Sequence, residues 1–64
     1  MPHYRIEYTE KGISTSHRLH ALETDEDARR IYNRFKKDME KEGDVVMGDL
    51  VFVEEEEKTR KVKV

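Results

Sequence analysis

The sequence predicts an α+β fold of two layers, in which one helix lies on one face of a four-stranded antiparallel sheet. Polar and apolar residues alternate over 3–9 and again over 13–21, the period of a half-buried strand. Apolar residues then recur at spacings of three and four between Asp25 and Glu42, the period of an amphipathic helix. Two further strand patterns follow, so the expected order is strand, strand, helix, strand, strand. The 64 residues contain no repeat or linker, and we expect a single small domain over 1–64.

The first two strands are expected to form a hairpin. Apolar residues occupy alternate positions on both sides of Lys11-Gly12: Tyr4, Ile6 and Tyr8 before it, Ile13 and Leu19 after it. A loop with an even number of residues keeps both sets on one face, whereas a three-residue loop would send them to opposite faces. We therefore predict a two-residue turn at Lys11-Gly12, with a four-residue loop as the alternative.

The helix has clear signals at both ends. Thr24 or Asp25 is placed to cap it, and acidic residues fill the first turn, where their charge complements the helix dipole. We expect the helix to end near Glu42-Gly43. Its apolar stripe consists of Ala28, Ile31, Tyr32, Phe35 and Met39.

The third strand contains a glycine, Gly48, whose role is open. Gly48 is either a bulge in one long strand or the start of a two-residue turn between two short strands, and we favour the bulge. A last turn is expected near Lys58-Thr59, with a final strand over 60–64. The expected core consists of Tyr4, Ile6, Tyr8, Ile13, Leu19, Ile31, Tyr32, Phe35, Met39 and one face of the third strand.

Composition limits the class of protein. The chain has no cysteine, which rules out disulfides and thiolate zinc sites and favours a reducing compartment such as the cytoplasm. The longest apolar run, Leu50 to Val53, is far too short to span a membrane. Glutamine is also absent and charged residues make up 44%, a bias typical of heat-tolerant proteins.

The run Leu50 to Val53 is apolar on both faces of its strand. A single helix can cover only one of those faces, and the sequence does not settle which one it covers. The alternative is that the valines merely reflect β-propensity on an open face. We expect the uncovered face to bind a protein partner or a second copy, through the residues Val45, Met47, Val51 and Val53.

A second candidate surface is a basic ridge on the outer side of the helix. The spacing of i, i+4, i+7 and i+11 aligns four cations opposite the apolar stripe: Arg30, Arg34, Lys37 and Lys41. Such a ridge can lie along phosphates, so these residues form the alternative nucleic-acid face. The same pattern is also typical of a solvated helix face, and the overall charge of −2 does not favour nucleic acid.

We expect no enzyme activity, cofactor or metal. Ser16 and His17 are neighbours on a strand and point to opposite faces, so they form no catalytic dyad. With the two-residue turn, His3 would lie across from His20, and two histidines are short of a zinc site. His17 is expected near Ile6, partly buried. The sequence thus predicts a small non-catalytic interaction or regulatory module.

Overall fold

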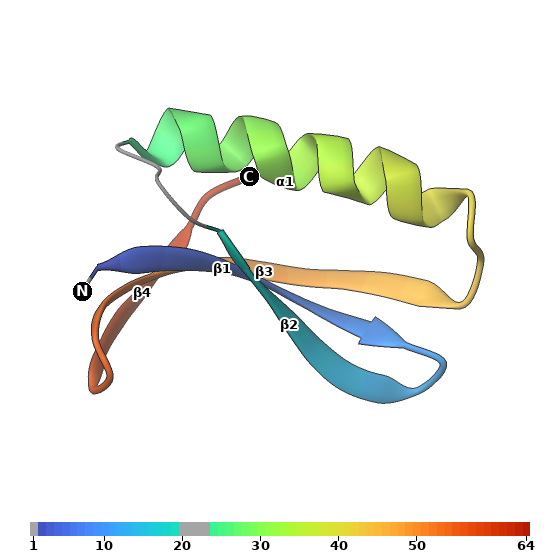
Figure 1. Ribbon diagram of the computed structural model, residues 1–64, viewed down its shortest axis with the longest axis horizontal. Coiled ribbons are helices and arrows are strands. Elements are labelled where there is room, and N and C mark those ends of the chain that lie inside the picture. Colours follow the sequence, from blue (N-terminus) through green and yellow to red (C-terminus); the bar gives the residue numbers. More distant parts are fainter. Residues whose placement is uncertain (1, 20–23) are drawn as a thin grey trace.

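The computed structural model describes residues 2–19 and 24–64 and contains one sheet and one helix (Figure 1). Its elements are β1 (His3–Glu10), β2 (Ile13–Leu19), α1 (Asp25–Glu40), β3 (Val45–Glu55) and β4 (Lys58–Val62). Neighbouring strands are antiparallel, in the order β2-β1-β3-β4. Because α1 lies across one face of this sheet (Figure 1), the expected α+β fold and its element order are confirmed.

The β1–β2 hairpin has the expected two-residue turn. Lys11 and Gly12 both have positive φ angles, 51° and 79°, as a type I′ turn requires. Glu10 and Ile13 face each other across this turn, and the register continues to Tyr4 opposite Leu19. The expected position of His3 directly across from His20 falls outside the described residues, because His20 is not among them.

Helix α1 begins as expected and ends earlier than expected. The hydroxyl of Thr24 accepts a hydrogen bond from the Asp27 backbone N–H at 3.2 Å, which makes Thr24 the N-cap. The helix ends at Glu40 with Lys41 as its C-cap, short of Glu42-Gly43. The chain leaves the helix through positive φ angles at Gly43 and Asp44, and the Asp44 carbonyl accepts a hydrogen bond from the Lys11 backbone N–H at 2.9 Å.

Gly48 is part of a β-bulge, as favoured from the sequence. Ile6 faces Leu50 and Tyr8 faces Met47, so Glu7 alone lies opposite both Gly48 and Asp49. A Cβ atom at Gly48 would lie 2.7 Å from the Glu7 carbonyl oxygen, a distance that side chains do not tolerate. Tyr32 donates its hydroxyl to the Gly48 carbonyl oxygen at 2.6 Å, which ties the bulge to α1.

The core lies between α1 and the middle of the sheet. It consists of Tyr4, Ile6, Leu19, Ala28, Tyr32, Leu50 and Val62, with Tyr8, Phe35, Met47 and Phe52 packed against it. After the bulge, Leu50 and Phe52 are therefore the residues of β3 that face the helix. Two expected core residues are exposed, Ile13 at 68% and Ile31 at 36%, and three are only partly buried: Tyr8, Phe35 and Met39. Ile13 stays exposed because it lies next to the turn of the edge strand β2.

The last turn lies two residues earlier than expected. Glu56 and Glu57 form it, and β4 begins at Lys58 rather than after it. This register places Lys58 opposite Glu55, and it places Val62 opposite Leu50, where Val62 is buried in the core. Among the described residues, no helix has the length and apolar character needed to cross a membrane.

Candidate interaction surfaces

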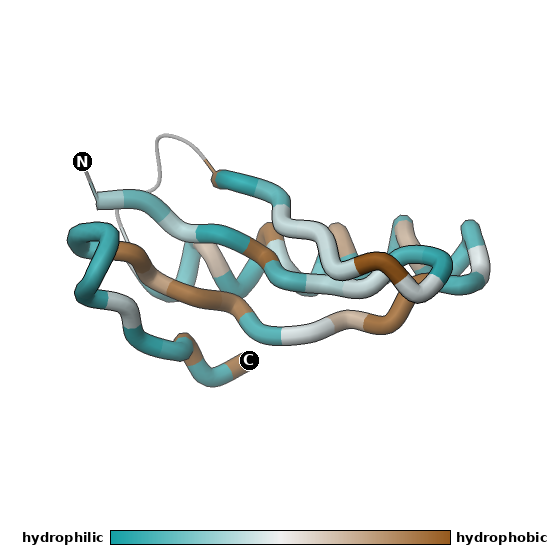
Figure 2. The backbone as a smooth tube through the Cα atoms, turned by 90° about the horizontal axis from the view of Figure 1, so that it is seen from below, coloured by the Kyte–Doolittle hydropathy of each residue, from teal (hydrophilic) through white to brown (hydrophobic). Residues whose placement is uncertain are grey.

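The open face of the sheet, opposite α1, has an apolar centre covered by polar side chains. Val51 and Val53 of β3 are only 5% exposed although they point away from the helix. Figure 2 shows this apolar stretch of β3 beside the hydrophilic β4. In the register, Val51 lies between Arg5 and Lys61. Because long basic side chains bury their alkyl stems over apolar neighbours, Val51 offers a partner little apolar area, and the exposed valine of this face is Val46, opposite Thr9.

The expected four-residue interface is split between the two faces of the sheet, which corrects the expectation of one surface. Met47 lies opposite Tyr8 and packs against the core on the helix side, and Val45 has the same phase. The bulge at Gly48 causes the split, because an extra residue inverts the alternation of side chains. Only Val51 and Val53 of the set lie on the open face.

Charges on the open face are mixed in sign. The Arg5 guanidinium pairs with Glu7 at 3.3 Å, and the Lys61 ammonium pairs with Asp49 at 3.5 Å. The Nε atom of Arg5 is buried and has no hydrogen-bond partner among the described residues. The aromatic rings of Tyr8 and Phe52 pack on the helix side, so among the described residues the open face has no Phe or Tyr side chain on which bases of single-stranded nucleic acid could stack.

A polar hollow of about 430 Å³ lies beside the bulge. It is lined by the side chains or backbone of Glu7, Tyr8, Thr9, Ser14, Thr15, Ser16, Gly48 and Asp49. Among the described residues, no histidine lines it, so none places an imidazole base beside its hydroxyl groups. Within residues 2–19 and 24–64, no cluster of three or more His, Asp or Glu side chains could hold a metal ion. His17 faces Ile6 in the register, as expected, but it is exposed and stacks on Phe35 with ring centroids 5.4 Å apart.

The basic ridge on α1 is present as a physical feature. Arg30, Arg34 and Lys37 line a shallow hollow of about 270 Å³ together with Asn33, and all four residues are exposed. Lys41, the C-cap, is exposed as well and continues the line. In the part of the chain that the structure describes, none of the four cations has an acidic group within ion-pair distance. Their charge is therefore available to an external anion.

The edge strand β2 is a surface that the sequence patterns did not single out. Within residues 2–19 and 24–64 it pairs only with β1, and all of its residues from Ile13 to Arg18 are exposed. Alternate residues of an antiparallel strand direct their backbone N–H and C=O groups to the same side. Since Ile13 closes the two-residue turn with Glu10, the outward residues are Ser14, Ser16 and Arg18. The missed signal is the composition of the strand, ISTSHRL, which has few charges and no proline.

The opposite edge of the sheet, β4, is protected. It has only five residues, KTRKV, and three of them are basic. Short length and positive charge are the usual means by which proteins prevent pairing at a sheet edge. The two edges of this sheet therefore differ, and β2 is the one that can accept another strand.

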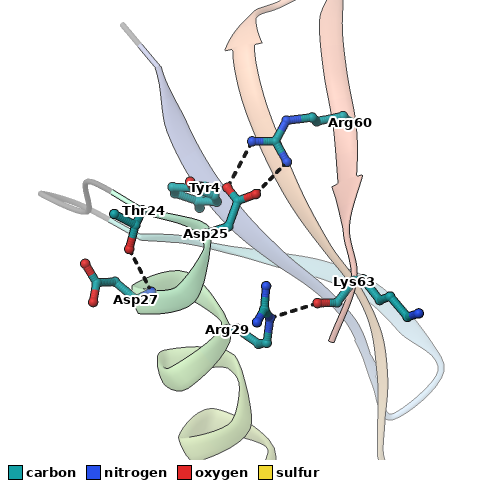
Figure 3. Close-up of polar contacts among 7 residues, drawn as sticks. All are labelled: Tyr4, Thr24, Asp25, Asp27, Arg29, Arg60 and Lys63. Atoms are coloured by element: carbon teal, nitrogen blue, oxygen red, sulfur yellow. Dashed lines mark hydrogen bonds and ion pairs between the residues drawn. The ribbon is translucent and has the colours of Figure 1, made fainter.

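A polar cluster fastens the beginning of α1 to β4 (Figure 3). Arg60 donates two hydrogen bonds to the Asp25 carboxylate, both 2.9 Å long, and the Tyr4 hydroxyl donates a third at 2.5 Å. These donors, Arg60 first and Tyr4 second, lower the pKa of Asp25 to about 2. Arg60 also lies over the ring of Phe52, 4.7 Å from its centroid. Every group in the cluster has its partner, so we assign it to stability.

Comparison of the chain with protein-family models, with curated proteins and with solved structures found no match. A functional proposal therefore depends on the geometry of these surfaces. Three of them differ in chemistry: an open sheet face with mixed charges, a helix ridge of one charge, and an unpaired strand edge.

Proposed function

We propose that this protein is a small non-catalytic interaction module that acts through protein contact, and that its binding element is the free edge of β2. The observation that carries the proposal is the difference between the two sheet edges. β4 is short and basic, whereas β2 exposes residues 13–18 with one permanently charged side chain, Arg18. An unprotected edge binds an extended strand through its backbone groups, a common mode of peptide recognition.

The open sheet face remains a candidate for part of the same contact. Val51 would reach a partner only if the side chains of Arg5 and Lys61 moved aside, and Val53, which lies between His3 and Thr59, is itself only 5% exposed. A partner bound at the edge of β2 needs no such movement, which is why the edge is the better supported site.

The test compares partner capture by the wild-type chain and by Ser16→Pro. Proline at Ser16 removes an outward N–H and leaves the pairing of β2 with β1 intact. We expect Ser16→Pro to lose a partner that the wild type and Ser16→Ala both retain. The captured complex should survive raised salt, because backbone pairing depends little on ionic strength. Equal capture by all three chains would rule out the edge.

The alternative function is nucleic-acid binding by the ridge on α1. It is supported by the alignment of Arg30, Arg34 and Lys37 around one hollow without acidic partners among the described residues. Titration with oligonucleotides at low and raised salt tests it, since phosphate contacts weaken steeply with salt. Arg34→Gln/Lys37→Gln should weaken such binding more than Lys36→Gln/Lys58→Gln, which removes the same charge elsewhere.

The proposed cellular setting is a reducing and warm one, with the cytoplasm as the expected compartment. It is supported by composition alone, since the chain lacks cysteine and glutamine. A thermal unfolding midpoint below about 55 °C, inside the mesophile range, would contradict the heat-tolerant part.

A further inference from the structure

We infer that the edge of β2 pairs with the same edge of a second copy of this chain, antiparallel and centred on Ser16. This inference rests on the proposed function, because it names the partner that the edge binds. A two-fold axis perpendicular to the sheet would join two four-stranded sheets into one continuous sheet with both helices on the same side.

The register follows from the length and direction of β2. Residues that face each other across an antiparallel pair point to the same side of the sheet, so the axis must pass beside a residue that faces itself. Centring the pair on Ser16 matches all seven residues of Ile13–Leu19 with their counterparts. It also brings together the outward N–H and C=O groups of Ser14, Ser16 and Arg18, which face the same three residues of the partner.

The side chains are compatible with this register. Arg18 would face Ser14 of the second copy, and His17 would face Thr15, so no like charges lie directly opposite each other. By contrast, a pair centred on Arg18 would oppose two guanidinium groups. A pair centred on Thr15 would leave Arg18 and Leu19 beyond the partner strand. Centring on Ser16 is therefore the register that uses the whole edge without charge repulsion.

In the dimer, the same register would bury the side chain of Ile13, which is exposed in the single chain. Ile13 is 68% exposed and points to the helix side of the sheet, at the turn end of β2. At the other end of the strand, Leu19 is buried in the core. Pairing about Ser16 places each Ile13 directly opposite Leu19 of the other copy, next to that copy's core. Two exposed isoleucine side chains would thus be removed from water in one step.

Single cysteines test the register, because the chain has none of its own. Ser16→Cys would face itself across the two-fold axis, within the 4.4–6.8 Å Cα separation that a disulfide requires. Ser14→Cys is the matched control: its two copies would lie about 13 Å apart along the strands. We expect mild oxidation to convert Ser16→Cys into a disulfide-linked dimer and to leave Ser14→Cys monomeric on a non-reducing gel.

Introducing a positive or a negative charge at Ser16 gives a second, non-covalent test. Ser16→Lys and Ser16→Glu each place like charges opposite each other, so each should raise the dimer dissociation constant about tenfold or more. An equimolar mixture of the two should recover dimer in sedimentation. Both variants change an exposed side chain, so circular dichroism should show an unchanged fold.

Three outcomes would overturn the inference. Sedimentation of the wild type as a monomer at high micromolar concentration would exclude the second copy, and selective partner capture by the wild type over Ser16→Pro would then still support the proposed function. A dimer unaffected by Ser16→Lys would place self-association elsewhere. Equal cross-linking of Ser14→Cys and Ser16→Cys would exclude the register. If the wild type neither dimerises nor captures a partner that Ser16→Pro loses, the proposed function is overturned as well.

Discussion

At the scale of single residues, Gly48 leaves no room for a side chain. The Glu7 carbonyl oxygen lies where a Cβ atom would be, at 2.7 Å, and this oxygen belongs to backbone that cannot rotate away. We expect Gly48→Ala to lower the free energy of unfolding by about 1–3 kcal/mol through backbone displacement at the bulge. Urea denaturation measures it. Asp49→Ala, at the other bulge residue, is the control and should cost less; an equal loss in both would contradict the steric explanation.

Asp25 gives the protein a defined response to acid. Its pKa is about 2 in the folded chain, because Arg60 and Tyr4 donate hydrogen bonds to the charged carboxylate, against 3.8 ordinarily. Because the folded pKa is lower than the unfolded one, the charged carboxylate stabilises the fold above about pH 4. This stabilisation is lost as the pH falls from about 4 to about 2. Because the carboxylate is 36% exposed, the contribution is about 1 kcal/mol or less.

Asp25→Asn should therefore be less stable than the wild type at neutral pH, and the difference should shrink between pH 4 and pH 2. Asp27→Asn is the matched control, since it removes the same charge from the first turn of α1 and has no contact with Arg60. Chemical denaturation across this pH range compares the three chains. A difference that stays constant with pH would show that Asp25 acts through something other than its charge.

At the scale of elements, the β1–β2 turn contains a residue type that disfavours its backbone conformation. Lys11 has a φ angle of 51°, in the left-handed region that asparagine and glycine tolerate better than lysine. Lys11→Asn should preserve the backbone hydrogen bond to Asp44 and raise the free energy of unfolding by about 0.5–1 kcal/mol. Lys11→Val, with a β-branched side chain, should lower it. Thermal unfolding of both variants decides whether the type I′ geometry limits stability.

Strand periodicity predicted correctly which face of the sheet most side chains lie on, but it did not predict how deeply they are buried. Alternation placed Ile13 on the helix side correctly, but it carries no information on how far α1 extends over the edge strand. The bulge at Gly48 was expected from the glycine itself. Its consequence for Val45 and Met47 was missed: the bulge places these two residues, which precede it, on the opposite face from Val51 and Val53.

Two other features had weak signals or none. The turn at Glu56-Glu57 contains none of the residues that usually mark turns, so it was placed two positions late. The cluster of Tyr4, Asp25 and Arg60 joins residues far apart in sequence, and only the paired sheet brings them together. The free edge of β2 depended on knowing the strand order, which alternation of residues does not supply.

At the scale of the whole molecule, the small core and the exposed edge of β2 suggest that folding stability depends on association of two copies. A chain of 64 residues buries only about 60% of its unfolded surface, so its own core gives a modest margin. Joining two copies at β2 would stabilise the folded state by mass action, because the unfolded chain has no paired edge. We expect the thermal unfolding midpoint of the wild type to rise by a few degrees for each tenfold increase in protein concentration.

The concentration dependence should disappear in Ser16→Lys, whose midpoint should equal that of the wild type at high dilution. Calorimetry over a hundredfold range of concentration makes this comparison. Ser14→Lys is an informative companion, since in the proposed register its ammonium group would face the Arg18 guanidinium of the other copy and should also weaken the dimer. A midpoint that does not change with concentration for the wild type would mean that each copy folds and remains alone, and the edge of β2 would then have to serve another protein.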